Sequence, residues 1–187
     1  MTSISKFLFG GNEANDGLRY AEHVHGKPVV VWNITPKCNL ACAHCYAAAR
    51  ADADAVLATD EAKRVIDDLA AWQVPVLLFS GGEPFCRKDI RELAEYAQVM
   101  GLRVTFSTNG TLIDDDTADW LARLGTGYVG ISIDGTERVH DEFRRHAGAY
   151  AASLAAIRRL VARGVKVGLR VTMMRRNVAS IPAIFQL

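Results

Sequence analysis

The sequence predicts an α/β fold built on a parallel sheet, and two observations support this prediction. Short apolar runs alternate with segments whose apolar residues recur at helical spacing. Such alternation is typical of parallel strands joined by right-handed helical crossovers. In addition, polar and glycine-rich segments follow the apolar runs, and the carboxyl ends of parallel strands usually carry the chemistry. We therefore expect one functional site at that edge of the sheet.

Five strands are predicted from continuous apolar runs, which suit strands buried on both faces. They cover residues 28–34, 75–80, 104–107, 128–133 and 166–172. Five helices are predicted from apolar residues at helical spacing, with Thr59 as the N-cap of the first and Gly101 at the end of the second. Their segments are 62–69, 90–97, 116–124, 150–163 and one that begins near Ser180.

The composition is that of an ordinary globular domain. The chain has 187 residues, half of them hydrophobic, and a formal net charge of +1. A nearly neutral chain is not expected to bind nucleic acid through its phosphates. The sequence contains no run of about 18 apolar residues and no secretory signal, so we expect no membrane segment and a cytoplasmic location. In that compartment cysteines bind metal more often than they form disulfides.

Three of the four cysteines, Cys38, Cys42 and Cys45, lie in one short loop after the first predicted strand. Thiolates that converge from a short loop suit a soft metal. Zinc normally takes four protein ligands, so a zinc site would need His44 or Cys86 as well. A [4Fe–4S] cluster usually takes four thiolates, and three would leave one iron open to another molecule. The spacing favours the cluster over a zinc site or over thiols that are merely packed.

Together with Gly81-Gly82-Glu83 after the second strand, the spacing C-x₃-C-x₂-C resembles the signature of the radical S-adenosylmethionine (SAM) superfamily. The resemblance implies a partial (β/α) barrel, which here is expected to stop before its sixth strand. It also implies a [4Fe–4S] cluster on Cys38, Cys42 and Cys45. In that family the open iron binds SAM, and an electron from the cluster breaks the C5′–S bond to give a 5′-deoxyadenosyl radical.

The same resemblance assigns contacts with SAM. Gly81, Gly82 and Glu83 would hold its amino group, and this agrees with physical expectation. Glycines let the backbone approach a ligand, and a carboxylate pairs with an ammonium group. Further contacts are expected at the ends of the third and fourth strands, and from an arginine in a loop that would pair with the SAM carboxylate: Ser107, Asn109, Ser132, Asp134 and Arg144. The alternatives are a simple Asn-Gly turn at Ser107–Gly110 and a surface charge at Arg144.

Three further residues are open to two interpretations or lie outside the motif. Arg170 is a charge inside the fifth predicted strand, so it must be paired or face a cavity. His44 stands where the family usually has an aromatic residue, and it either stacks near the adenine of SAM or plays no part. Cys86 has no place in the motif and is interpreted as a buried free thiol.

Residues 1–27 are predicted to form a lead segment, and residues 28–187 a radical SAM core that is incomplete at its C-terminal end. The sequence also resembles the tetrapyrrole-pathway group of the family, in segments such as 4–6, 17–20, 129–135 and 166–170. That group implies removal of acetate side chains from 12,18-didecarboxysiroheme in alternative heme biosynthesis. It also implies an external one-electron donor and a second [4Fe–4S] cluster in a C-terminal region, without which this fragment would be inactive.

Three other functions remain open from the sequence. One is propionate loss on the heme d1 route, and another is modification of a peptide by a radical SAM maturase. The third is a metal-binding or electron-transfer module without SAM chemistry. A plain zinc domain would not need the glycine-rich segments that follow the second, third and fourth strands, so the enzyme is favoured.

Overall fold

The computed structural model describes residues 27–53 and 56–186. Five parallel strands form one sheet in sequential order, which confirms the expected α/β class. They are β1 (Val30–Asn33), β2 (Val76–Ser80), β3 (Arg103–Thr108), β4 (Tyr128–Ser132) and β5 (Val167–Arg170). Except for Lys27, the expected lead segment lies outside the described residues, as do residues 4–6 and 17–20 of the tetrapyrrole resemblance.

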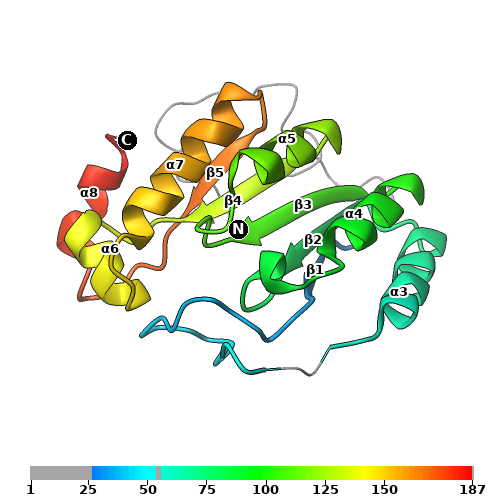
Figure 1. Ribbon diagram of the computed structural model, residues 1–187, viewed down its shortest axis with the longest axis horizontal. Coiled ribbons are helices and arrows are strands. Elements are labelled where there is room, and N and C mark those ends of the chain that lie inside the picture. Colours follow the sequence, from blue (N-terminus) through cyan, green and yellow to red (C-terminus); the bar gives the residue numbers. More distant parts are fainter. Residues whose placement is uncertain (1–26, 54–55, 187) are drawn as a thin grey trace.

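The crossover helices α3, α4, α5 and α7 lie along one face of the sheet (Figure 1). This placement follows from sequential strand order, because each right-handed crossover then turns toward the same side. The helices are α3 (Thr59–Ala71), α4 (Ile90–Val99), α5 (Asp115–Arg123), α6 (Glu137–Arg144), α7 (Ala149–Ala162) and α8 (Ile181–Ile184), with short 3₁₀ turns η2 (Pro84–Cys86) and η3 (Val178–Ser180).

Side chains alternate between the two faces of the sheet, and only one face is apolar throughout. The face toward the helices carries fully buried side chains such as Leu77, Phe79, Val104, Phe106, Val129 and Ile131. The other face is polar or small near the strand ends, and Ser107 pairs there with Gly130. The prediction that the strands are buried on both faces is therefore wrong for the edge strand β1. Val31 of β1 is 57% exposed, because it points away from the described helices.

The predicted helix ends are mostly confirmed, with one correction. Gly101 follows α4 with a φ of 85°, a conformation that glycine adopts without penalty. Thr59 is not the N-cap of α3, because Ala58 holds that position and Thr59 donates its hydroxyl to Asp89 at 2.8 Å. Glu61 caps the helix instead, since its Oε2 accepts from the backbone N–H of Ala58 at 2.8 Å. None of the described helices is both long and apolar enough to cross a membrane.

The segment between β1 and α3, blue to cyan in Figure 1, runs past the carboxyl ends of the strands toward α6. It is tied there because the backbone N–H of Ala43 donates to Phe143 O of α6 at 2.8 Å. The predicted cysteine loop lies in this segment. The sheet therefore brings the loop to the edge where the other polar segments end.

Candidate functional site

The cysteine loop is joined directly to the Gly81-Gly82-Glu83 turn by backbone hydrogen bonds. Gly82 N donates to Thr35 O, and Glu83 N donates to Lys37 O, each at 2.8 Å. A Cβ atom on Gly82 would lie only 2.4 Å from Lys37 O. Glycine is thus required here because the turn approaches the chain's own backbone. The contact fixes the three residues that lead into Cys38.

Gly82→Ala is expected to push the turn away from Lys37 and to displace the cysteine loop. The overlap is with backbone, so the cost should be about 1–3 kcal/mol in the free energy of unfolding, with loss of bound iron after reconstitution. Gly101→Ala is the matched control, because it places a side chain at positive φ with nothing within 4 Å. It should cost about 1–2 kcal/mol but keep the iron. Equal iron contents in the two variants would contradict the prediction.

Glu83 is fully buried, and its carboxylate receives three hydrogen bonds. Oε1 accepts from the Thr108 hydroxyl at 2.8 Å and from Phe85 N at 3.2 Å, while Oε2 accepts from Asn109 N at 2.8 Å. Burial raises the pKa of Glu83 to about 7, against the opposing effect of these donors. The side chain therefore joins the end of β2 to the end of β3.

Asn109 connects the end of β3 to the cysteine loop through a closed set of side-chain bonds. Its Nδ2 donates to Asn39 Oδ1 at 2.9 Å, and Asn39 Nδ2 donates to Thr111 Oγ1 at 2.8 Å. Thr111 returns two bonds to Asn109 Oδ1, from its backbone N–H at 2.8 Å and its hydroxyl at 2.7 Å. The segment forms a turn, and its side chains also contact the cysteine loop. Asn39 and Thr111 were missed from the sequence, although Asn39 directly follows Cys38.

Each of the three loop cysteines accepts an N–H···S hydrogen bond. Leu40 N lies 3.4 Å from Cys38 Sγ, Ala49 N lies 3.5 Å from Cys45 Sγ, and Arg144 Nη1 lies 3.7 Å from Cys42 Sγ. Hydrogen bonds to the sulfurs are among the features by which a protein tunes an iron–sulfur cluster. The donor set of this loop therefore fits a thiolate-bound cluster.

The four cysteines are all free thiols, and burial raises the pKa of Cys38 to about 11. A bound metal would have to displace that proton, because the thiolate is the ligand. Among the described residues, no three or more His, Cys, Asp and Glu side chains are close enough to hold one metal ion.

Arg144 lies at the end of α6, which corrects its expected place in a loop. Its Nη2 stands 2.6 Å from Oδ2 of Asp134, and the Asp134 side chain is completely buried. His44 Nε2 lies 3.5 Å from the same oxygen, and burial lowers the pKa of His44. The His44 ring also packs against Phe143, with centroids 5.3 Å apart. The three polar side chains form one buried group beside Cys42.

Three atoms of this group are buried without a hydrogen-bond partner in the described residues: His44 Nδ1, Asp134 Oδ2 and Arg144 Nε. The contact between Arg144 and Asp134 is close, but it lacks hydrogen-bond geometry. Unpaired buried polar atoms are rare in folded proteins, and their clustering calls for an explanation such as water or a ligand. Both donor and acceptor atoms are present, so the group fits a small polar molecule with charged ends.

The remaining predicted residues have fewer contacts. Ser107 and Ser132 are half-buried on the polar face of the sheet, near the ends of β3 and β4. Arg170 is also half-buried, and it packs over Gly130, where a Cβ atom would lie 2.4 Å from its Nε. Cys86 is half-buried rather than buried, and its side chain borders the cysteine loop.

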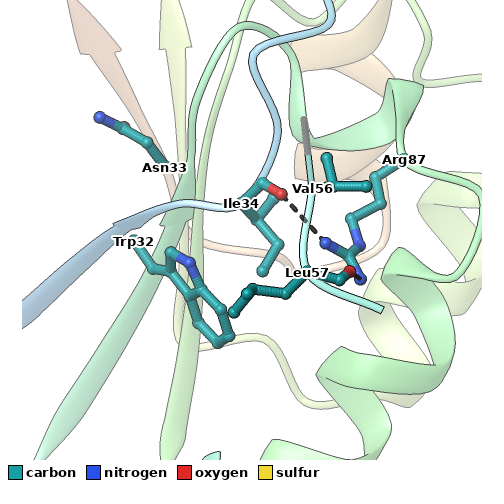
Figure 2. Close-up of a pocket in the computed structure, with 6 residues that line it drawn as sticks. All are labelled: Trp32, Asn33, Ile34, Val56, Leu57 and Arg87. Carbon is teal, nitrogen blue, oxygen red and sulfur yellow. Dashed lines mark hydrogen bonds between the residues drawn. The ribbon is translucent and has the colours of Figure 1, made fainter. Parts of the chain in front are cut away.

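A pocket of about 380 Å³ lies beside the end of β1, and Figure 2 shows Arg87 at its wall. The guanidinium donates to Ile34 O at 3.1 Å and to Leu57 O at 2.9 Å, and it forms an ion pair with Asp89 at 2.7 Å. Sequence reasoning had not singled out Arg87. These contacts hold the chain just before Thr35, so the arginine braces the entry to the cysteine loop. A second pocket, of about 310 Å³, lies against Cys38 and Arg145.

A family model described as the radical SAM superfamily matches residues 32–187. The chain belongs to this superfamily. It is 48% identical, over its whole length, to half of the Fe-coproporphyrin III synthase of Methanosarcina barkeri. It is 43% identical over 86% of its length to 40% of the pre-heme d1 synthase of Dinoroseobacter shibae. The mycofactocin maturase MftC of Mycobacterium tuberculosis is 36% identical over 81% of the chain and 39% of its own length.

Among solved structures, SuiB of Streptococcus suis bound to S-adenosylmethionine superposes with a TM-score of 0.73. The match covers 84% of this chain and 36% of that chain, at 18% identity. At this identity the likeness concerns the fold alone, and it supports the expected partial barrel. The chain spans half or less of the length of the relatives described above. Membership of the superfamily implies a [4Fe–4S] cluster and SAM, and the cysteine loop with its polar group fits both.

Proposed function

We propose that this chain is the core of a radical SAM enzyme that cleaves SAM reductively at a [4Fe–4S] cluster held by Cys38, Cys42 and Cys45. One observation carries the proposal: three cysteines, each with a hydrogen bond to its sulfur, lie where the ends of β2, β3 and α6 meet. The bound cluster and SAM would supply the radical. The chain's own residues hold the loop in place and surround it with polar groups.

The contacts with SAM are part of the same proposal. Gly81, Gly82 and Glu83 hold its amino group, and Arg144 pairs with its carboxylate through the otherwise unpaired Nε. Ser132 and Asp134 contact the ribose and carboxylate of SAM. Ser107 and Asn109, from the end of the neighbouring strand, make further contacts with SAM. Asp134 Oδ2 forms an ion pair with Arg144 but accepts no hydrogen bond, and this supports the placement, because a ligand hydroxyl would supply one.

For the substrate, we propose a tetrapyrrole, namely 12,18-didecarboxysiroheme, from which acetate side chains are removed to give iron-coproporphyrin. The support is the 48% identity to a protein named Fe-coproporphyrin III synthase. Propionate loss on the heme d1 route is the second candidate, supported by 43% identity to a pre-heme d1 synthase. Peptide modification has weaker support, from the 36% identity to a maturase. An external one-electron donor and a second cluster outside this chain complete the proposal.

The decisive experiment uses the full-length protein, reconstituted with iron and sulfide under anaerobic conditions and reduced. It is incubated with SAM and 12,18-didecarboxysiroheme, and the products are followed by mass spectrometry. We expect 5′-deoxyadenosine together with a tetrapyrrole that has lost its acetate groups. If 5′-deoxyadenosine forms while the tetrapyrrole mass stays unchanged, the radical core stands and the substrate assignment fails. Absence of 5′-deoxyadenosine under all donors and substrates would reject the enzyme itself.

A further inference from the structure

Arg144 is the one described charged side chain that donates a hydrogen bond to a loop cysteine. Its Nη1 lies 3.7 Å from Cys42 Sγ, whereas Cys38 and Cys45 accept from the backbone N–H groups of Leu40 and Ala49. The residue is 8% exposed, so water screens its charge only weakly. A buried guanidinium at this place therefore acts on the sulfur more strongly than a surface arginine could.

Several contacts hold the guanidinium in this orientation. Asp134, which is fully buried, takes Nη2 at 2.6 Å, so the two ends of the planar fork face the carboxylate and the sulfur. The preceding residue, Phe143, is tied to the cysteine loop by the bond from Ala43 N at 2.8 Å. The helix and the loop therefore stay at a fixed separation. A fork shape is needed to reach both partners at once, and an ammonium group lacks it.

We propose that Arg144 is a positioning residue for the cluster, and that its N–H bond to the Cys42 sulfur raises the reduction potential of that cluster. The inference rests on the proposed function, since it requires the cluster at this loop. Reduction adds one electron, and part of the added negative charge lies on the sulfur ligands. A donor aimed at one of those sulfurs stabilises the reduced form more than the oxidised form. Asp134 acts by keeping the fork turned toward Cys42.

The role differs from pairing with the SAM carboxylate, because it operates before SAM is bound. Nη1 donates to Cys42 and Nη2 forms the ion pair with Asp134, whereas Nε is the nitrogen without a hydrogen bond. The two roles therefore use different atoms of one side chain. Measurement of the potential in the absence of SAM isolates the contact with the sulfur.

The experiment compares Arg144→Met and Arg144→Lys with wild-type full-length protein, all reconstituted anaerobically. Cluster potentials are measured by redox titration followed by electron paramagnetic resonance, first without SAM. Addition of SAM afterwards identifies the signal of this loop, because that signal changes. Arg138→Met is the control, because this substitution also removes one positive charge from the same helix. The Arg138 side chain is 82% exposed and forms an ion pair with Glu142.

We expect Arg144→Met to lower the equilibrium constant for reduction about tenfold, which is about 59 mV for one electron. Arg144→Lys should also lower it, because the ammonium stays with Asp134 and leaves the sulfur. Arg138→Met should match wild type. A potential in Arg144→Met equal to that of Arg138→Met overturns the inference. Full recovery in Arg144→Lys also overturns it, since charge alone would then suffice.

Two checks keep the result decisive. Circular dichroism reports whether Arg144→Met folds. If it does not fold, the Arg144→Lys variant alone is used: a lowered reduction potential supports the inference, and an unchanged potential contradicts it. If wild-type protein holds no cluster at this loop, both the proposed function and the inference fail. If the cluster is present and its potential does not depend on Arg144, only the inference fails.

Discussion

Replacement of Cys38, Cys42 and Cys45 together by alanine is expected to remove the SAM-responsive cluster and reduce 5′-deoxyadenosine formation to background. The loop supplies all three protein ligands of the proposed cluster, so no partial binding mode remains. The fold should survive, because the core on the helix side of the sheet contains none of these residues. The measurements are iron and sulfide content, the paramagnetic signal of the reduced cluster, and 5′-deoxyadenosine by chromatography.

Cys86→Ala is the control for this variant. Cys86 is also a free thiol, and it borders the same loop without being part of the motif. It should keep the cluster and its activity. The assignment is wrong if the triple variant keeps a SAM-responsive cluster, if the wild type holds only zinc, or if Cys86→Ala loses the cluster as completely as the triple variant.

Glu83→Gln is expected to change how the stability of the chain depends on pH. Burial raises the pKa of the folded carboxyl from 4.5 to about 7. As pH rises through this window, the unfolded chain ionises first, so the folded state progressively loses stability. The loss should total on the order of 3 kcal/mol and remain constant above the folded pKa. Glutamine cannot ionise, so the variant should not lose this stability. Between about pH 4 and about pH 8, its free energy of unfolding should therefore rise relative to that of wild type by this amount.

The measurement is the free energy of unfolding of the metal-free chain in urea, at both pH values, for wild type and variant. At about pH 4 the variant should be less stable than wild type. Its amide nitrogen cannot accept a hydrogen bond, so one of the three donors that bond to Glu83 would lose its acceptor, at a cost of about 1–3 kcal/mol. Glu137→Gln, on the surface of α6, is the control and should show little change. A constant difference between Glu83→Gln and wild type would mean that Glu83 titrates normally.

Much of the fold could be predicted from the sequence, because each strand is a short apolar run that contrasts with its flanks. Helix α6 was not predicted. It is only eight residues long, and its buried positions include His140 and Arg144, which a hydrophobic pattern does not detect. Those residues are buried against segments outside the helix itself. His140 Nδ1, for example, accepts from the backbone N–H of Asp134 at 3.1 Å.

The location of the site was also predictable, since the ends of parallel strands meet at one edge. The connections within it were not. The hydrogen bonds that Glu83 accepts from Thr108 and Asn109 join residues 25 and 26 positions apart, and Arg144 contacts a cysteine 102 positions away. Such pairings depend on tertiary structure, and a motif written along one segment does not contain them. The roles of Asn39, Thr111 and Arg87 were missed for the same reason.

The bonds between the turn at Gly81–Glu83 and residues 35–37 have a consequence for protein engineering. A chimera that exchanged only one of these two loops would replace one side of these hydrogen bonds and keep the other. Here the backbone of one loop is the hydrogen-bonding partner of the other, and the glycines match the carbonyl positions of Thr35 and Lys37. The two segments 35–45 and 81–86 should therefore be exchanged together, from the same parent, so that the hydrogen bonds between them are kept.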